Sequence, residues 1–292
     1  MRKPRSWQQW SLIGLGIAVA TLLLLVPLFL IFTQALQGGW VLLKQNLSED
    51  FMQHAIGLTL LATLLTIPIN LVFGILIAWC VTRYDFRGRR LLITLIDIPY
   101  ATSPVVAGLC YLVVYGAESV VGRWLSSHDV QVMFAWPGIV MVTVFITSPY
   151  VARILIPLMQ AQGSDEEAAA LTLGANGRQI LWRVTLPNIR WALLYGVVVT
   201  NARAVGEFGA VSVVSGTIMN QTLTLPLLVE QLNNDYKTPA AFTAAALLAS
   251  MALITLAIKS VMEWRQRQRD RIAATVPPEA PRGRTAALPV RP

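Results

Sequence analysis

The chain has 292 residues and a net charge of +8, and it is 55% hydrophobic but only 13% charged. An ordinary soluble domain carries about a quarter charged residues, whereas here Asp, Glu, Lys and Arg are absent from 6–43, 55–82, 130–152, 208–229 and 238–258. A helix needs roughly 20 mostly apolar residues to cross a membrane. The composition therefore excludes a soluble globular protein and predicts an all-α, polytopic membrane protein.

The first apolar run, SLIGLGIAVATLLLLVPLFLIF, covers residues 11–32. A cleavable signal peptide has an apolar core of about 7–15 residues and a small-residue cleavage site. This run is longer, and no Ala-x-Ala-like site closes it. We expect a retained helix, preceded by a short cytoplasmic N-terminus over residues 1–10.

Six membrane spans are predicted from the apolar runs: 11–33, 56–82, 91–116, 132–157, 190–215 and 240–262. The loops on one side carry 17 arginines and lysines, and those on the other side carry 3. Cytoplasmic loops are enriched in these residues, so we expect both termini in the cytoplasm. The transmembrane domain would cover 11–264, followed by a disordered, basic cytoplasmic tail over 265–292. Because the positive charges are spread over several loops, they do not indicate nucleic-acid binding.

The third predicted span is irregular. Pro99 and Pro104 each remove a backbone donor, and Asp97 lies close to them. Membrane helices tolerate such breaks where the freed groups are buried in protein or line a wet cavity. Two interpretations remain open: a kinked helix beside a transport path, with Thr102 and Ser103 as hydroxyl donors, or a kink that serves packing alone.

The fifth predicted span carries Arg203 and Glu207, four residues apart and therefore on one helix face. A charge in mid-membrane costs about 2.5–3.5 kcal/mol on insertion scales, and pairing reduces this cost. Ala202, Gly206 and Ala210 form a stripe of small residues that permits close helix approach. Either the ion pair only neutralises itself in the bundle, or it lines the path, where Arg203 would be the one basic group well inside a span.

Motifs for catalysis or nucleotide binding are absent, including H-E-x-x-H, G-x-S-x-G and G-x-x-x-x-G-K-[ST]. The two histidines, His54 and His128, are far apart in sequence, and two cysteines alone make no metal site. We expect this chain not to be an enzyme and to hold no metal or cofactor.

A polar segment, SDEEAAALTLGANGRQILWRVTLP, separates the fourth and fifth spans. Ser164 and Glu167 have the spacing of a capping box, and Gly174 suits a left-handed helix end. A second short helix is predicted over 177–185, closed by Pro187. The pattern predicts a rigid helical hairpin on the cytoplasmic side.

This hairpin could rest on lipid headgroups or dock onto a protein. Its first helix begins with Asp165, Glu166 and Glu167, which an anionic inner leaflet would repel. The charge pattern therefore favours protein docking.

The hairpin resembles the EAA loop of the inner-membrane permease subunits of binding-protein-dependent ABC importers. Residues that carry the resemblance are Glu167, Ala168, Ala169, Gly174, Leu186 and Pro187. Glu167 lies one residue further from the glycine than in the family pattern. The resemblance implies that the loop over 160–187 couples the permease to an ATPase.

Longer stretches, such as NARAVGEFGAVSVVSG, resemble permeases of sulfate/thiosulfate importers, and more weakly those of molybdate importers. The resemblance implies alternating-access import across a bacterial inner membrane, with ATP and Mg²⁺ bound by partner subunits. Implied partners are a second related permease, two cytoplasmic ATPase subunits, a periplasmic sulfate-binding protein and membrane lipid.

Two other functions remain open at this point. The same machine could carry molybdate or tungstate. Alternatively, an ion-coupled carrier could use Asp97, Arg203 and Glu207. The candidate path residues are Asp97, Thr102, Ser103, Pro104, Arg203 and Glu207.

Overall fold

A computed structural model describes residues 7–275, and in this part of the chain every regular element is a helix. The elements are α1 (Trp7–Ala20), η1 (Thr21–Leu25), α2 (Val26–Leu36), α3 (Gly39–Ser48), α4 (Asp50–Arg83), α5 (Arg89–Ala101), α6 (Pro104–Tyr115), α7 (Val120–Ser126), α8 (Trp136–Gln162), α9 (Asp165–Thr172), α10 (Gly177–Ile180), η2 (Leu181–Thr185), α11 (Leu186–Val205), α12 (Gly209–Val214), α13 (Leu225–Asn234) and α14 (Thr238–Thr275).

Four helices are long and apolar enough to cross a membrane: Trp10–Leu36, Asp50–Arg83, Trp136–Gln162 and Thr238–Arg265. A fifth span is possible if the bent pair α5 and α6 is counted as one. The all-helical, polytopic prediction is confirmed, while the count of six stays a prediction. Two predicted spans, 91–116 and 190–215, are interrupted, the first between α5 and α6 and the second between α11 and α12.

The centre of the bundle is the pair α4 and α8, which packs more extensively than any other pair of helices among the described residues. Small residues permit the close approach: a Cβ added to Gly74 would lie 2.5 Å from the Cβ of Val151. One turn closer to the N-terminus of each helix, the Asn70 amide donates to the Thr147 hydroxyl at 2.6 Å. Close packing and a buried hydrogen bond together fix the position of α4 against α8.

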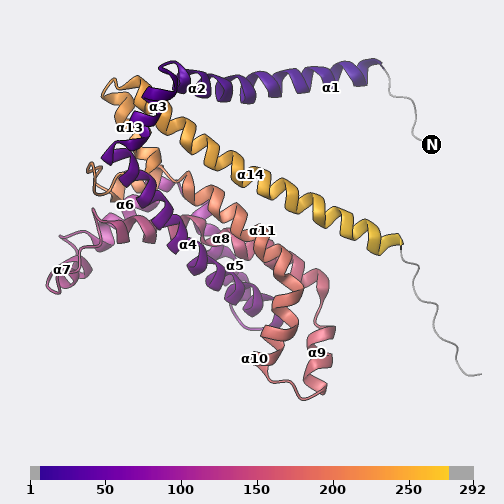
Figure 1. Cartoon of the computed structure of the whole chain (residues 1–292). Coiled ribbons are helices and arrows are strands. Elements are labelled where there is room, and N and C mark those ends of the chain that lie inside the picture. Colours follow the sequence, from indigo (N-terminus) through magenta and orange to yellow (C-terminus); the bar gives the residue numbers. More distant parts are fainter. Residues whose placement is uncertain (1–6, 276–292) are drawn as a thin grey trace, which may run out of the picture.

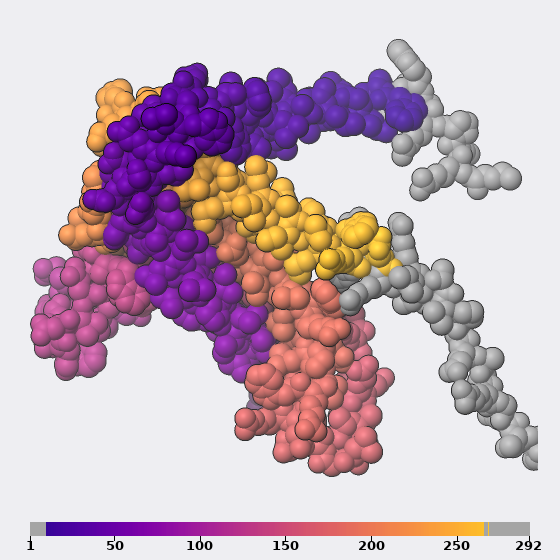
Figure 2. All heavy atoms as spheres, viewed as in Figure 1, coloured from indigo at the N-terminus to yellow at the C-terminus, as the bar shows by residue number. Residues whose placement is uncertain are grey.

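The N-terminal elements α1, η1 and α2 form an arm that leads away from the bundle (Figure 1). None of the residues in its most apolar 18-residue window is buried, and Figure 2 shows the arm projecting from the body of the molecule. Such an apolar surface must be covered by lipid or by another chain.

The arm also contains a π-helical turn, η1, which ends two residues before Pro27. A proline ring clashes with the carbonyl four residues earlier in an α-helix, and a π-turn relaxes the backbone at that carbonyl. The same arrangement recurs at Pro187, two residues after η2 ends.

At the other end of the described chain, α14 continues as far as Thr275. The helix therefore extends eleven residues into the tail predicted over 265–292. The remainder of that predicted tail lies outside the described residues, as do residues 1–6 of the predicted cytoplasmic N-terminus.

Candidate functional site

The predicted hairpin is present and projects beyond the end of the bundle, with α9 and α10 side by side (Figure 1). The first helix, α9, ends with Leu173 as its C-cap, and Gly174 follows in the left-handed conformation with φ +84°. The predicted helix end at Gly174 is confirmed. The chain then turns into α10, which begins at Gly177.

The predicted capping box at Ser164 is wrong, because the Ser164 side chain makes no capping hydrogen bond. A capping box occurs instead at the start of the second helix. The Asn176 side chain accepts from the backbone N–H of Gln179, and the Gln179 side chain accepts from the N–H of Asn176, each at 2.9 Å. The Glu167 carboxylate forms an ion pair with Arg83 instead of capping the helix.

Pro187 does not close the hairpin as predicted. Helical structure is continuous from α10 through η2 into α11, because the π-turn of η2 accommodates the proline. The second arm of the hairpin is therefore the cytoplasmic extension of a core helix. A displacement of the hairpin would therefore reach α11 through continuous helical structure.

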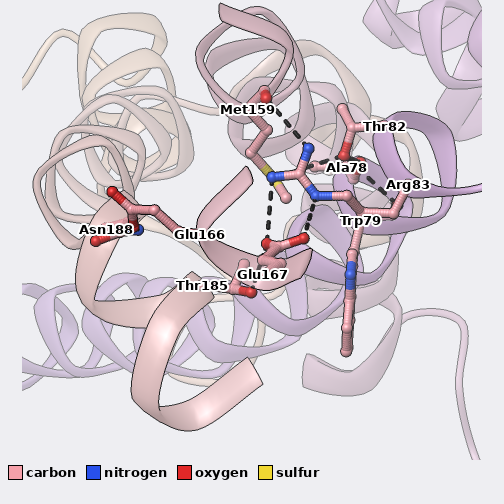
Figure 3. A network of polar contacts seen from close by, with 9 residues as sticks. All are labelled: Ala78, Trp79, Thr82, Arg83, Met159, Glu166, Glu167, Thr185 and Asn188. Atoms are coloured by element: carbon pink, nitrogen blue, oxygen red, sulfur yellow. Dashed lines mark hydrogen bonds and ion pairs between the residues drawn. The ribbon is translucent and has the colours of Figure 1, made fainter. Parts of the chain in front are cut away.

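An ion pair fixes the root of the hairpin to the bundle, as Figure 3 shows. The Nε atom of Arg83, at the end of α4, lies 2.6 Å from a carboxylate oxygen of Glu167, and its Nη2 donates to the other oxygen at 3.2 Å. The two side chains are only 12% and 15% exposed. A two-point contact of a guanidinium with a carboxylate is geometrically specific and strong when water is largely excluded.

Further contacts extend this network over three core helices. Arg83 donates through Nη1 to the backbone oxygen of Met159 in α8 at 3.3 Å, and the Thr185 hydroxyl donates to Glu167 at 2.7 Å. Glu166 accepts from the side chain of Asn188 in α11. The root of the hairpin is thereby tied to α4, α8 and α11 at once.

A polar cavity of about 190 Å³ lies beside the network. Its lining residues are Arg83, Gln162, Gly163, Glu166, Glu167, Thr185, Asn188 and Ile189. The cavity has room for water around the ion pair, which matches the small remaining exposure of both side chains.

The outer surface of the hairpin carries several exposed apolar side chains among charged ones. Ala168 and Ala169 are exposed, Leu171 is 64% exposed and Leu173 is 88% exposed. On the second arm, Trp182 is 64% exposed. Large exposed apolar side chains on a projecting element are typical of a protein docking surface.

The predicted break in the third span is a sharp bend of 107° between α5 and α6. Thr102 and Ser103 form the bend, and Pro104 is the first residue of α6. The Thr102 hydroxyl donates to the backbone oxygen of Ile98 at 2.8 Å, whereas Ser103 is exposed and makes no capping bond. Of the two predicted donors, only the Ser103 hydroxyl is uncommitted.

The predicted pair of Arg203 and Glu207 is also present, with Nη1 and Oε2 2.6 Å apart. The Glu207 side chain is 1% exposed, and its other oxygen accepts from the backbone N–H of Ala210 at 3.2 Å. However, α11 ends at Val205, so Glu207 stands in the break before α12. The predicted stripe that ends at Ala210 is consequently divided between two helices.

The two breaks meet in space. A Cβ added to Gly209, at the start of α12, would lie 3.3 Å from Pro104, at the start of α6. A Cβ added to Gly108 would lie 2.7 Å from the backbone oxygen of Ala210. The structure thus brings together the segment that contains the predicted path residues Thr102, Ser103 and Pro104 and the segment that contains Glu207.

Sequence reasoning missed Arg153, which lies four residues before the end of the predicted span 132–157. Its Nε donates to the Asp97 carboxylate at 2.8 Å, and its guanidinium carbon lies 4.3 Å from the ring centroid of Tyr100. The available signal was complementary charge, because the third and fourth predicted spans each contain one ionisable residue of opposite sign. These opposite charges could have predicted that the third and fourth spans lie side by side.

Within residues 7–275, no group of three His, Cys, Asp or Glu side chains is placed to hold a metal ion. The ion pairs described above lie at three places: the hairpin root, the Arg203–Glu207 break and the Asp97–Arg153 contact.

Known proteins identify the fold and the family. The family described as "Binding-protein-dependent transport system inner membrane component" matches residues 70–269. The sulfate transport system permease protein CysW of Escherichia coli strain K12 is 57% identical over 93% of both chains. The sulfate transport system permease protein CysT of the same strain is 34% identical over 84% of this chain and 88% of its own.

A chain in the crystal structure of a bacterial alginate ABC transporter, in complex with a pentasaccharide-bound periplasmic protein, has a similar fold. The TM-score is 0.74 at 17% identity, and the match covers 89% of this chain and 94% of that chain. This chain is a multi-pass membrane protein that belongs to the family of binding-protein-dependent transport system inner membrane components.

Proposed function

We propose that this chain is the permease subunit of an ATP-driven importer that moves sulfate and thiosulfate across the bacterial inner membrane by alternating access. The observation that carries the proposal is 57% identity over 93% of the chain to a permease named for sulfate transport. The similarity extends through the hairpin and both breaks, and is not confined to one motif.

Energy for transport would come from a partner. The sequence contains no G-x-x-x-x-G-K-[ST] loop to cradle a nucleotide, so two cytoplasmic ATPase subunits would bind ATP and Mg²⁺. The exposed Leu171 and Leu173 side chains offer an ATPase an apolar contact surface. Closure of the ATPases would push on the hairpin, and the Arg83–Glu167 contact would pass the displacement to α4.

A second, related permease would complete the path. The uncovered part of the arm, α1 and η1, supports this, since it offers a long apolar surface beyond the body of the chain. Similarity to both CysW and CysT supports a pair of related but different permeases. A periplasmic sulfate-binding protein would deliver the anion, and the 17-to-3 distribution of basic residues supports cytoplasmic termini.

The structure disfavours an ion-coupled carrier. Such a carrier needs a carboxylate that can exchange a proton or cation during each cycle. Here Glu207 is buried and held by Arg203 and by the backbone of α12, and the charge of Asp97 is neutralised by Arg153 whenever that pair is closed. Both candidate carboxylates already have a cationic partner.

Uptake of labelled sulfate by sulfur-starved cells tests the proposal, in a strain that lacks the gene and in the same strain complemented with it. We expect uptake to be lost on deletion, restored by the gene and little affected by excess molybdate. Strong competition by molybdate, or uptake of molybdate alone, would reassign the substrate to the larger oxyanions. Restored sulfate uptake that persists after ATP depletion would contradict the ATP-driven mechanism.

A further inference from the structure

Arg153 presents an accessible cation inside a membrane span. Its side chain is 47% exposed and that of Asp97 is 39% exposed. Asp97 lies eight residues after the start of α5 at Arg89, and Arg153 lies nine residues before the end of α8. At 1.5 Å per residue, both lie about 12–14 Å from the helix ends that adjoin the hairpin.

This exposed charge must face something other than lipid. Charged side chains in membrane spans face the bundle interior, a partner or a water-filled cavity, because hydrocarbon cannot solvate them. Arg153 also lies on the side of α8 that packs against α5, which leads directly to the bend at Thr102 and Ser103. The open side of the pair therefore faces water or a partner chain, and α5 connects it along the chain to the bend before α6.

The guanidinium of Arg153 has unused donors. Only its Nε makes a hydrogen bond to a described residue, so the two terminal nitrogens are available to a ligand. Five N–H groups in a planar fork suit a tetrahedral oxyanion, which can accept two parallel hydrogen bonds. The Tyr100 ring under the guanidinium holds its plane in place without using any donor.

Arg203 differs in each of these respects. Its side chain is 30% exposed, and its charge is matched at 2.6 Å by a carboxylate that is 1% exposed. Moving Glu207 away from Arg203 would also disturb the hydrogen bond that Glu207 accepts from the backbone N–H of Ala210 in the first turn of α12. Arg203 is thus committed to the fold, whereas Arg153 is held by one exposed carboxylate that water can replace.

We propose that Arg153, oriented by Tyr100, forms a transient binding site for a tetrahedral oxyanion, and that Asp97 is the internal anion that competes with the substrate for this guanidinium. This inference rests on the proposed function and adds a residue that the predicted path lacked. An incoming dianion displaces the Asp97 carboxylate and accepts hydrogen bonds from the terminal nitrogens. Return of Asp97 to Arg153 then expels the dianion toward the hairpin side. Competition by Asp97 therefore keeps the dianion from staying bound to Arg153.

Sulfate uptake into proteoliposomes that contain the complete transporter tests this inference with four variants. We expect Arg153→Gln to slow uptake by about tenfold or more, as loss of a charge-assisted hydrogen bond predicts. Arg153→Lys should be intermediate, because lysine keeps the charge but not the fork. Asp97→Asn should slow uptake several-fold and make sulfate preloaded inside the vesicles a stronger inhibitor. Arg153→Gln combined with Asp97→Asn should be as slow as Arg153→Gln alone.

Asp85→Asn is the matched control, since Asp85 pairs with Arg89 at the surface and is 98% exposed. We expect this variant to transport like the wild type. Recovery of uptake in the double variant, or wild-type rates for Arg153→Gln, would overturn the inference and leave a purely structural ion pair.

A second readout separates this inference from the proposed substrate. Thermal unfolding of the purified transporter is compared in sulfate and in chloride of equal ionic strength. We expect sulfate to raise the wild-type midpoint, to raise that of Asp97→Asn further and to leave that of Arg153→Gln unchanged. If the wild-type vesicles carry only molybdate, the sulfate assignment fails, and the same variants are compared with molybdate. A sulfate shift equal in wild type and Arg153→Gln would count against the site whichever anion is carried.

Discussion

Two ion pairs in this molecule join helices that are distant in sequence, yet they differ in burial. Arg83 and Glu167 are 12% and 15% exposed, and the pair is reinforced by Thr185 and a backbone oxygen. Arg153 and Asp97 are 47% and 39% exposed, and a single hydrogen bond joins them. A shielded, multiply bonded pair transmits force, whereas an exposed pair with free donors can exchange partners. We therefore assign the first pair to coupling and the second to the substrate.

The largest effect is expected from breaking the shielded pair. Arg83→Gln and Glu167→Gln each leave a mostly buried charge without its partner, which should lower the free energy of unfolding by about 2–4 kcal/mol. Sulfate uptake should be lost in both. Thermal unfolding in detergent and uptake in cells measure the two effects, with Asp85→Asn as the unaffected control.

The combined variant, Arg83→Gln with Glu167→Gln, separates the coupling role from stability. Removing both charges should restore much of the stability, because no unpaired charge remains, but it should not restore uptake. Full recovery of uptake would show that the pair only stabilises the hairpin.

A smaller effect is expected at the turn of the hairpin. Gly174 has φ +84°, so Gly174→Ala should cost about 1–2 kcal/mol, because a side chain disfavours the left-handed conformation. Gly177→Ala is the matched control, since a Cβ there would meet nothing within 4 Å and the backbone is not left-handed. Equal losses of stability and uptake in the two variants would contradict the assigned turn geometry.

Thr185→Val should have a still smaller effect. The change keeps the volume of this buried side chain but removes the 2.7 Å hydrogen bond to Glu167, at a cost of about 1 kcal/mol. Arg83 remains as a partner, so uptake should be reduced and not lost. Urea unfolding of the purified protein measures the difference from Thr185→Ser, which keeps the hydroxyl.

The smallest effect on stability is expected at the exposed pair of Asp97 and Arg153. A change at this pair tests most sharply whether the two ion pairs have different roles. Asp97→Asn should change the free energy of unfolding by less than about 1 kcal/mol, because solvent-exposed ion pairs contribute little. The same variant should nevertheless slow sulfate uptake. A stability loss as large as that of Glu167→Gln would remove the distinction between the two pairs.

Features that depend on neighbouring residues were predictable from the sequence. The charge-free runs predicted an all-helical membrane protein, and the left-handed helix end at Gly174 followed from residue type and position. The Arg203–Glu207 pair was also predictable, because its members are four residues apart.

Features that depend on distant partners were not predictable in this way. Glu167 fitted a local capping box, but Arg83, 84 residues away, offers a charged partner that the backbone N–H of Ser164 cannot match. Likewise, Asp97 and Arg153 are 56 residues apart, and only the packing of α5 on α8 brings them together. The helix continues through Pro187 because a π-turn precedes the proline, and no residue pattern in the segment predicted that turn.

The central claim is that ATP hydrolysis by partner subunits drives sulfate through this chain. The most direct measurement is sulfate accumulation in proteoliposomes that hold the complete transporter, with ATP supplied on the hairpin side and the sulfate-binding protein on the other. We expect accumulation that requires ATP, survives an uncoupler and disappears with Glu167→Gln. Accumulation that an ion gradient drives without ATP, or that Glu167→Gln leaves intact, would contradict the claim.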